Sequence, residues 1–202
     1  MRRNAAVYIP EHREGEHTFM LYIMRHGRTD WNVRHKLQGR TDIPLNEEGR
    51  RMAEKAREEY RDVPLDICYS SPLVRARETA EIVLRGRGIP ILTDDRLREM
   101  SFGEYEGMEN TFSKPECPIN ALFQKPEEYT RSVGGAETFD ELFARTGEFL
   151  KEVIDPLMIQ GKNVLIVGHG AMNLSIIGRI RGIPISGFWS PGIENCRMIR
   201  LI

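Results

Sequence analysis

The chain has 202 residues, 40% of them hydrophobic and 29% charged, and its formal net charge is −1 at pH 7. This length suits one well-buried core and is short for two. The balanced charge argues against nucleic acid or a membrane surface as a partner, and no apolar run approaches the roughly 20 residues that a membrane span needs.

Targeting and metal-binding patterns are not visible in the sequence either. The charged start at residues 1–4 precedes no apolar signal core. Three widely spaced cysteines, Cys68, Cys117 and Cys196, fit neither a disulfide framework nor a zinc pattern. We therefore expect a cytoplasmic protein with no metal site and no cofactor. The sequence leaves the oligomeric state open, a homodimer included.

Residues 1–18 are polar and mixed in charge, which predicts an arm that precedes the fold. A short edge strand at Ala5–Ile9 and solvated side chains for His12 and His17 are expected there. The domain itself is expected to span residues 19–202.

Two short apolar runs each end in a histidine between small or charged residues. Phe19–Met24 is too short for a helix and reads as an interior strand of a parallel sheet, followed by Arg25-His26-Gly27. Residues 163–167 repeat the pattern before Gly168-His169-Gly170. If the two strands are parallel neighbours, about 4.8 Å apart, their carboxyl ends bring His26 and His169 into one pocket. Ligands of open α/β sheets bind at this edge.

Helices alternate with these strands. Asn46 is a predicted N-cap for a surface helix over Glu47–Tyr60, and a strand is expected over Asp66–Ser70. Ser71 as cap and Pro72 at the first helical position predict the start of a second helix. Its apolar face comprises Leu73, Ala76, Ala80, Val83 and Leu84, and Gly86 and Gly88 end it. Arg75 falls in the first turn, where its guanidinium and the free N–H groups of the helix could serve one anion.

The second half of the chain continues the alternation. The expected elements are a strand at Ile89–Leu92, a glycine-punctuated loop at Arg96–Gly107, an irregular insertion at 108–135 that caps the site, a helix from Thr138 to Ile154 that Asp155-Pro156 bends or ends, a helix at Ala171–Arg181 ended by Gly182, and a strand at Cys196–Ile202. Three insertion aromatics, Phe112, Phe123 and Tyr129, are expected to pack beneath it rather than line a specificity pocket. The predicted fold is a single three-layer α/β/α domain with a mostly parallel sheet.

Five residues carry the predicted chemistry: Arg25, His26, Arg75, Glu99 and His169. Two arginines near one ligand indicate phosphate or carboxylate, which a guanidinium binds through paired N–H groups. Neighbouring cations lower the pKa of a histidine, and the neutral ring can attack phosphorus. Glu99 is the candidate proton donor, with a pKa expected to rise through partial burial beside a phosphate dianion. Taken singly, each residue is more often structural or solvated.

Four motifs in this order resemble the histidine phosphatase superfamily, in its phosphoglycerate-mutase-like branch. They are Arg25-His26-Gly27, residues 70–76 around Arg75, residues 97–107 around Glu99, and Gly168-His169-Gly170, and the match runs from about Met20 to Ile202. The resemblance implies that His26 is the phosphohistidine nucleophile, that Arg25, Arg75 and His169 complete the phosphate pocket, and that Glu99 is the proton donor. It further implies that Asn32, Gln38, Gly39 and Gly170 bind substrate.

Two positions depart from the family pattern. Residues 134–138 resemble a Gly-Gly-Glu-Ser segment with Ala136 inserted, which leaves the contacts of Glu137 undetermined, with Arg145 downstream. Arg28 stands where many relatives have glutamate and indicates a more anionic substrate.

The favoured function is a phosphomonoesterase that acts on a small cytosolic phosphate ester. A mutase must hold a phosphorylated intermediate, yet residues 108–133 offer only Lys114, Lys125 and Arg131 as basic groups. Mutase-type phosphoryl transfer stays the alternative, and a module that binds a phosphorylated ligand without turnover stays a second one.

Overall fold

A five-stranded sheet forms the centre of the molecule. The structure is a computed structural model that describes residues 19–202, so the arm and edge strand expected before residue 19 lie outside the described residues. The strands are β1 (Leu21–Arg25), β2 (Ile67–Ser70), β3 (Ile91–Thr93), β4 (Val164–Gly168) and β5 (Met198–Arg200). Their order is β3-β2-β4-β1-β5, and only β5 runs antiparallel to its neighbour. The predicted mostly parallel sheet is confirmed.

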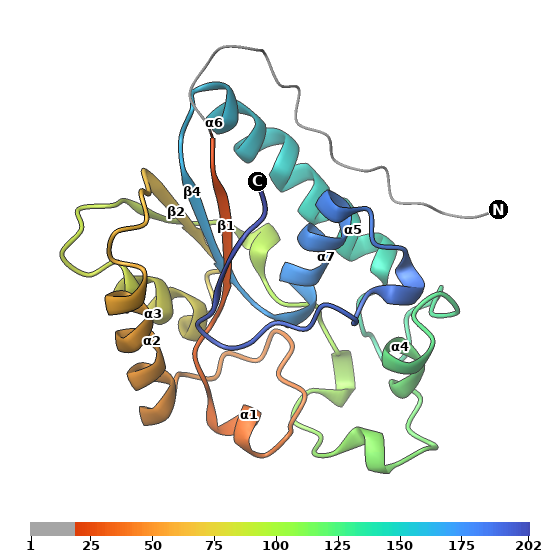
Figure 1. Cartoon of the computed structure of the whole chain (residues 1–202). Helices are drawn as coiled ribbons and strands as arrows, with labels where there is room; N and C mark the ends of the chain where they lie inside the picture. Colours follow the sequence, from red (N-terminus) through yellow and green to blue (C-terminus); the bar gives the residue numbers. More distant parts are fainter. Residues whose placement is uncertain (1–18) are drawn as a thin grey trace.

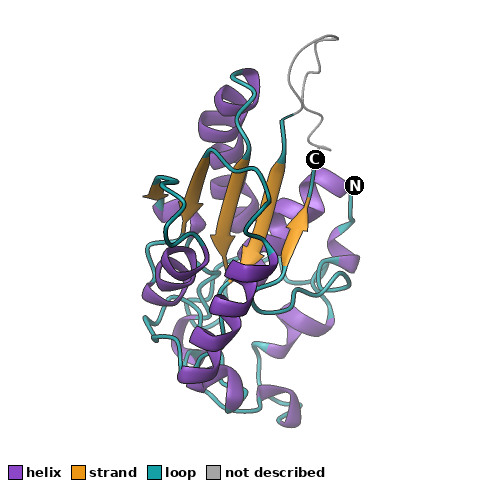
Figure 2. Ribbon diagram, turned by 60° about the vertical axis from the view of Figure 1, so that its left-hand side comes forward, coloured by secondary structure: helices purple, strands orange, loops and turns teal. Residues whose placement is uncertain are grey.

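Helices cover both faces of this sheet (Figures 1 and 2). They are α1 (Asp30–Val33), α2 (Glu47–Glu59), α3 (Val74–Val83), α4 (Asn120–Gln124), α5 (Phe139–Phe149), α6 (Asp155–Ile159) and α7 (Gly170–Arg181). In Figure 1, α2 and α3 lie on one side of the strands, and α5 and α7 lie on the other. The α/β class with helices on both sheet faces is therefore confirmed.

The strand β4 is buried along its whole length because both of its faces are covered. Val164 and Ile166 join the apolar cluster under α5 and α7, while Leu165 and Val167 join the cluster under α2 and α3. Successive side chains of a strand point to opposite faces, so an interior parallel strand needs an unbroken apolar run. The apolar run at residues 164–167 is the feature of the sequence that predicted this strand.

Capping residues fix three helix boundaries, of which those at Asn46 and Gly182 were predicted. Asn46 Oδ1 accepts a hydrogen bond from Gly49 N at 2.8 Å at the start of α2. Thr138 and Glu141 form a reciprocal capping box at the start of α5. Gly182 ends α7 in the left-handed conformation, with φ +66°.

The predicted start of the second helix is wrong by two residues. Helix α3 begins at Val74 with Leu73 as its N-cap, because Ser71 is still part of the sheet edge: its N–H donates to Val167 O at 3.0 Å. The Ser71 hydroxyl accepts from Leu73 N at 3.3 Å and so closes a turn instead of capping the helix.

Two C-terminal predictions also need correction. Of the two alternatives predicted for Asp155-Pro156, an end of the helix is wrong: a π-helical turn at Leu150–Ile154 links α5 to α6, and the helix continues to Ile159. The wider turn and the placement of Pro156 at the first turn of α6 accommodate its missing N–H. The last strand is shorter than predicted: it spans Met198–Arg200, and Cys196 at its predicted start takes a left-handed backbone with φ +58°, outside the extended range of a regular strand.

The insertion at residues 108–135 gathers near α1 at the carboxyl ends of the parallel strands (Figure 1). It contains a 3₁₀ turn at Thr111–Ser113 and the short helix α4, and the rest is irregular. Tyr129 is buried and Phe123 packs against the main apolar cluster, as predicted. Phe112 is not packed beneath the insertion: 60% of its surface is exposed.

Candidate active site

The rings of His26 and His169 meet at the carboxyl edge of the sheet. Arg25 pairs with Gly168 in the parallel register of β1 and β4, so the two histidines are the next residues at the same edge. Their ring centroids lie 5.1 Å apart, and the side chains are almost completely buried. The structure thus brings together the two histidines that the strand pattern paired.

The ring of His26 is held in one tautomer. Its Nδ1 lies 2.7 Å from Gly27 O. A carbonyl oxygen only accepts, so Nδ1 carries the hydrogen and Nε2 keeps a free lone pair. Burial, together with Arg75 and Arg25, holds the pKa of His26 well below its ordinary value of 6.5. A neutral imidazole with a free Nε2 is competent as a nucleophile.

Burial likewise holds the pKa of His169 well below 6.5, with Arg75 and His26 adding to the effect. Neither ring nitrogen of His169 has a hydrogen-bond partner among residues 19–202. One nitrogen of a neutral ring donates and the other accepts. His169 can therefore offer a hydrogen bond to a ligand without bringing a charge of its own.

The main chain at His26 is fixed by two residues that sequence reasoning missed. Thr79 Oγ1 on α3 accepts from Gly27 N at 3.0 Å, and Asn195 Nδ2 donates to His26 O at 2.6 Å. Gly27 is needed at this turn, since a Cβ there would lie 2.6 Å from Gly49 O. Thr79 lay within a predicted helix and Asn195 in an unstructured stretch, so neither carried a local signal.

Arg75 is completely buried, and two of its N–H groups support the loop after β1. Its Nη1 donates to Thr41 O at 2.8 Å and its Nη2 to Gly39 O at 2.7 Å, while Nε has no partner. Burial lowers the pKa of Arg75 to about 10, which leaves it charged at neutral pH. The expected sharing of an anion with the helix N–H groups is not met at Val74, whose N–H donates to Asp42 Oδ1 at 2.7 Å.

Arg25 projects from the end of β1. Its Nη1 donates to Ile193 O at 3.0 Å, and its buried Nε has no partner. Burial lowers the pKa of Arg25, and the nearby charge of Glu99 opposes this drop. Both predicted arginines therefore keep N–H groups unused by the protein.

The carboxyl group of Glu99 lies at the start of α7, next to His169. Oε1 accepts from Met100 N at 2.8 Å and from Met172 N at 3.0 Å, whereas Oε2 accepts only from Ala171 N, at 3.2 Å. A Cβ placed on Gly170 would lie 3.4 Å from Glu99 Oε2 and 4.0 Å from Arg25 Cζ. The open side of Gly170 thus faces the space between the carboxyl group and the guanidinium.

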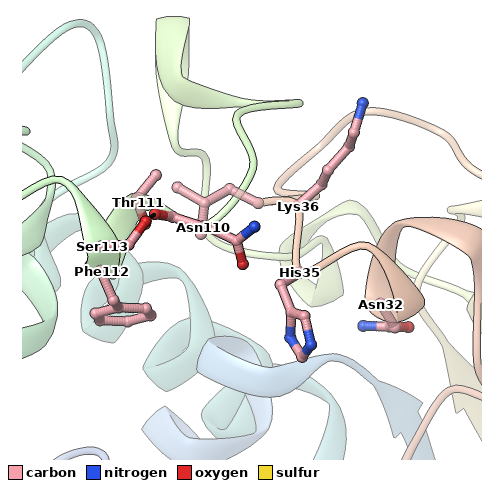
Figure 3. Close-up of a pocket in the computed structure, with 8 residues that line it drawn as sticks. Asn32, His35, Lys36, Asn110, Thr111, Phe112 and Ser113 are labelled. Carbon is pink, nitrogen blue, oxygen red and sulfur yellow. Dashed lines mark hydrogen bonds between the residues drawn. The ribbon is translucent and has the colours of Figure 1, made fainter.

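The other predicted binding residues hold the loop between β1 and α2. Asn32 Oδ1 accepts from Thr29 N at 3.1 Å, and Gln38 Oε1 accepts from Thr29 Oγ1 at 3.0 Å. Gly39 has φ +54° and presents its carbonyl to Arg75. Asn32 also lines an open groove beside the insertion (Figure 3). Gln38 and Gly39 therefore hold the loop after β1 in place, and Gly39 also binds the guanidinium of Arg75.

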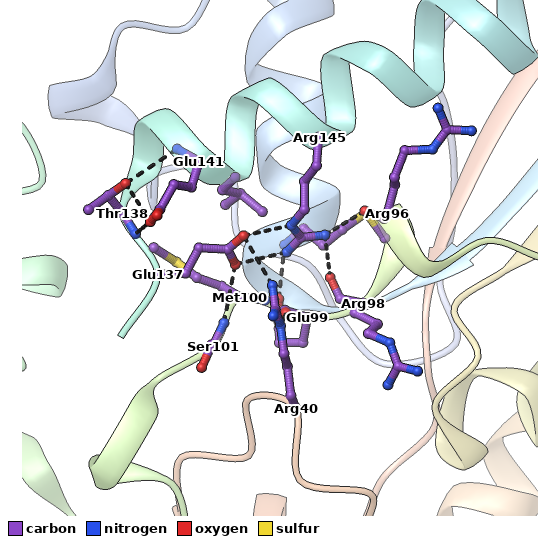
Figure 4. A network of polar contacts seen from close by, with 12 residues as sticks. Arg40, Arg96, Arg98, Glu99, Met100, Ser101, Glu137, Thr138, Glu141 and Arg145 are labelled. Carbon is purple, nitrogen blue, oxygen red and sulfur yellow. Dashed lines mark hydrogen bonds and ion pairs between the residues drawn. The ribbon is translucent and has the colours of Figure 1, made fainter. Parts of the chain in front are cut away.

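A second network surrounds the segment that carries Glu99 (Figure 4). Arg145 binds both carboxylate oxygens of Glu137, at 2.7 and 3.0 Å, and donates to Arg98 O at 2.7 Å. Glu137 Oε2 accepts from Ser101 N at 3.2 Å, and Arg40 Nη2 lies 3.2 Å from Glu137 Oε1. Glu137, which follows the inserted Ala136, thus holds the backbone at Ser101, and Arg145 holds it at Arg98, on the two sides of Glu99.

Arg28 does not add a free cation to the site. Its Nη1 lies 2.7 Å from Glu48 Oε1, and both side chains are nearly half exposed. Its charge is thus paired at the surface, and the more anionic substrate that this residue indicates stays a prediction.

Residues 19–202 contain no group of three or more His, Cys, Asp or Glu side chains that could hold a metal ion. Cys68, Cys117 and Cys196 are buried and free. None of the helices in this described part is long and apolar enough to cross a membrane.

The family follows from a match over nearly all of the described chain. The model of the histidine phosphatase superfamily (branch 1) matches residues 21–202. The chain belongs to this family. Its buried histidine pair thus lies in a histidine phosphatase fold, as the four motifs predicted.

Relatives in the family include both phosphatases and mutases. The uncharacterized phosphatase PhoE of Bacillus subtilis is 37% identical over 178 residues, which cover 88% of this chain and 82% of PhoE. The probable phosphoglycerate mutase GpmB of Salmonella choleraesuis is 29% identical and covers 90% of this chain and 83% of its own. Among solved structures, YhfR of Bacillus stearothermophilus superposes with a TM-score of 0.81 at 34% identity, over 91% of this chain and 90% of YhfR.

Proposed function

We propose that this protein is a phosphomonoesterase that hydrolyses a small phosphate ester through a phosphohistidine intermediate on His26. The observation that carries the proposal is a set of buried polar atoms that have no hydrogen-bond partner in the part of the chain that the structure describes: Nε of Arg25, Nε of Arg75 and both ring nitrogens of His169. A buried polar group left unsatisfied costs about 1–3 kcal/mol. Four such atoms around the free Nε2 of His26 favour a ligand rich in acceptor oxygens, and a phosphoryl group is one.

The first step transfers the phosphoryl group to the enzyme. His26 Nε2 attacks phosphorus, the bond from phosphorus to the alcohol oxygen breaks, and the electron pair leaves with that oxygen. Protonated Glu99 donates its proton to the leaving oxygen, most readily from Oε2, which has one backbone donor where Oε1 has two. Arg25 and Arg75 balance the charge on the equatorial oxygens, and His169 donates a hydrogen bond to them.

The second step releases phosphate. A water molecule attacks the phosphorus of phosphohistidine while the carboxylate of Glu99 accepts one of its protons. The bond between phosphorus and Nε2 then breaks, which restores neutral His26 and protonated Glu99. Every proton and electron pair is thereby accounted for without a further reactant.

Hydrolysis is favoured over mutase-type transfer by the charges around the site. Lys114, Lys125 and Arg131 of the insertion are exposed, and Lys125 lies 3.1 Å from Glu128. Arg40 and Arg145 are both bound to Glu137. These contacts pair the charges of Lys125, Arg40 and Arg145, so Lys114 and Arg131 are the two basic groups of the insertion left to hold a second phosphate during reorientation. The similarity to PhoE supports the phosphatase assignment, and the similarity to GpmB keeps the mutase as the alternative.

A panel of phosphate esters tests the proposal directly. Released phosphate is measured for each ester, and 3-phosphoglycerate with 2,3-bisphosphoglycerate serves as the mutase control. We expect phosphate release from several monoesters and little isomerisation. Robust isomerisation without phosphate release would reverse the assignment, and tight ligand binding without either product would favour a non-catalytic binding module.

A further inference from the structure

An open groove of about 420 Å³ lies between the loop after β1 and the insertion (Figure 3). Its lining residues are Asn32, His35, Lys36, Leu37, Asn110, Thr111, Phe112 and Ser113. We propose that this groove binds the alcohol portion of the substrate and takes an uncharged ring that carries hydroxyl groups. The inference rests on the proposed function and names the substrate class for the same site.

Both walls of the groove are connected to the phosphate pocket. On one wall, the segment at 35–37 leads within two residues to Gly39, whose carbonyl holds Arg75. On the other, the ring of Phe112 lies 5.1 Å from that of Phe123, which in turn lies 5.7 Å from Phe102, three residues after Glu99. The groove therefore adjoins both the loop that holds Arg75 and the aromatic side chains that lead to the segment carrying Glu99.

The groove is built before any ligand arrives. Asn110 N donates to His35 O at 3.1 Å, and both residues have a left-handed backbone with φ 51°. That conformation costs a residue with a side chain about 1 kcal/mol or more. Asparagine adopts it more readily, so the strain rests mainly on His35, and backbone strain of this kind often marks ligand sites. Leu37 N donates to Met108 O at 3.1 Å and fixes the same two segments.

Phe112 provides an apolar face in the groove. The residue is 60% exposed, although Phe123 and Tyr129 of the insertion are packed. An exposed aromatic face binds the flat face of a sugar or a base by stacking. The exposure that contradicts the prediction from sequence is thus explained by a role in binding.

The polar groups of the groove are mostly uncharged. Asn32, Asn110 and Ser113 carry donors and acceptors that suit hydroxyl groups. The ammonium group of Lys36 lies 3.4 Å from Glu109 and 5.5 Å above the ring of Trp31, so its charge is already balanced. The described lining residues include no arginine. A second phosphate or a carboxylate on the substrate would find no free guanidinium here.

Binding measurements separate this inference from the catalytic proposal. The His26→Ala protein is titrated calorimetrically with inorganic phosphate, ethyl phosphate, a hexose 6-phosphate and a nucleoside 5′-monophosphate. The ring-bearing esters are expected to bind more tightly than ethyl phosphate. Adding Phe112→Ala should weaken the ring esters about tenfold, the equivalent of 1.4 kcal/mol, and leave ethyl phosphate and phosphate unchanged.

Further variants test the polar wall without straining the backbone. Glycine adopts a left-handed conformation readily, so His35→Gly and Asn110→Gly remove the side chains and keep the fold. Each should weaken the ring esters alone, whereas Lys114→Ala, an exposed residue outside the groove, should change nothing. Equal affinity for ethyl phosphate and the ring esters, or an equal loss for all ligands in Phe112→Ala, would overturn the inference. Preferential binding of ring esters by a wild-type protein that releases no phosphate would sink the proposed function and leave the groove assignment standing.

Discussion

The rings of His26 and His169 face each other at 5.1 Å because the residues before them, Arg25 and Gly168, are paired in adjoining parallel strands. Burial and two neighbouring arginines keep both rings neutral. Stability and catalysis should both depend on this neutral state.

Stability should fall as the pH drops below about 6.5, the ordinary pKa of histidine. In the unfolded chain both residues take up protons near this pH, whereas in the folded protein their pKa values are lowered. Stability is therefore fully present above the unfolded value and is lost as the pH falls towards the folded one, by about 1.4 kcal/mol per pH unit for each histidine. Urea unfolding between pH 5 and 7.5 measures this slope. His169→Gln should lower the slope of the free energy of unfolding against pH by the contribution of one histidine, about 1.4 kcal/mol per pH unit. An unchanged slope would contradict the claim that burial lowers the pKa of His169.

Glu99→Gln should slow the hydrolysis of esters with poor leaving groups far more than the hydrolysis of esters with good ones. An alkoxide needs a proton as it departs, whereas p-nitrophenolate leaves without one. We expect kcat/KM for alkyl phosphates to fall about 10²- to 10⁴-fold and that for p-nitrophenyl phosphate to fall much less. Glu48→Gln, at the surface, is the matched control. An equal loss for both kinds of ester would remove Glu99 from the acid role.

Gly170→Ala should separate activity from stability. The added methyl group makes ordinary contacts, 3.4 Å from Glu99 Oε2 and 4.0 Å from Arg25 Cζ, so the protein should fold. Alanine at the start of α7 should even raise the free energy of unfolding by up to about 1 kcal/mol. In the proposed mechanism the ester oxygen lies between Glu99 and Arg25, the space that the methyl group would enter, so kcat/KM should drop at least tenfold, on the order of 1.4 kcal/mol. Full activity would show that substrate does not approach between these two groups.

Arg145→Lys, like Glu99→Gln, should lower kcat/KM more for alkyl phosphates than for p-nitrophenyl phosphate. Lysine keeps the charge but loses the paired N–H groups that bind Glu137 and Arg98 O on either side of Glu99. A small displacement of the acid should cost alkyl esters on the order of tenfold to a hundredfold in kcat/KM and p-nitrophenyl phosphate less. Arg50→Lys, which changes the surface pair with Glu78, is the control. A loss equal for both esters would indicate general destabilisation instead.

The parts of the fold set by local patterns could be predicted from the sequence. The apolar run of β4 and the capping residue Asn46 act through immediate neighbours, so strand, helix and their order follow. The pairing of the two histidines followed because parallel strands end at one edge. The start of α3 could not be predicted, because Ser71 can either cap a helix or extend the strand pairing. In the structure its N–H donates to Val167 O across the sheet.

Contacts between distant segments lay beyond the sequence. Asn195 reaches His26 O across 169 residues, and Arg75 uses its guanidinium on Gly39 and Thr41 as well as facing the pocket. The exposure of Phe112 depends on how the insertion packs. Such contacts and exposures depend on tertiary packing, which the periodicity of a sequence does not predict.

The most direct test of the whole account is a search for phosphate on His26. The protein is mixed briefly with a ³²P-labelled monoester, quenched in alkali and digested, and the labelled peptide is identified. The account predicts an acid-labile, alkali-stable label on His26 that His26→Ala abolishes together with turnover. Turnover with no label on His26, or a label that persists in His26→Ala, would contradict it.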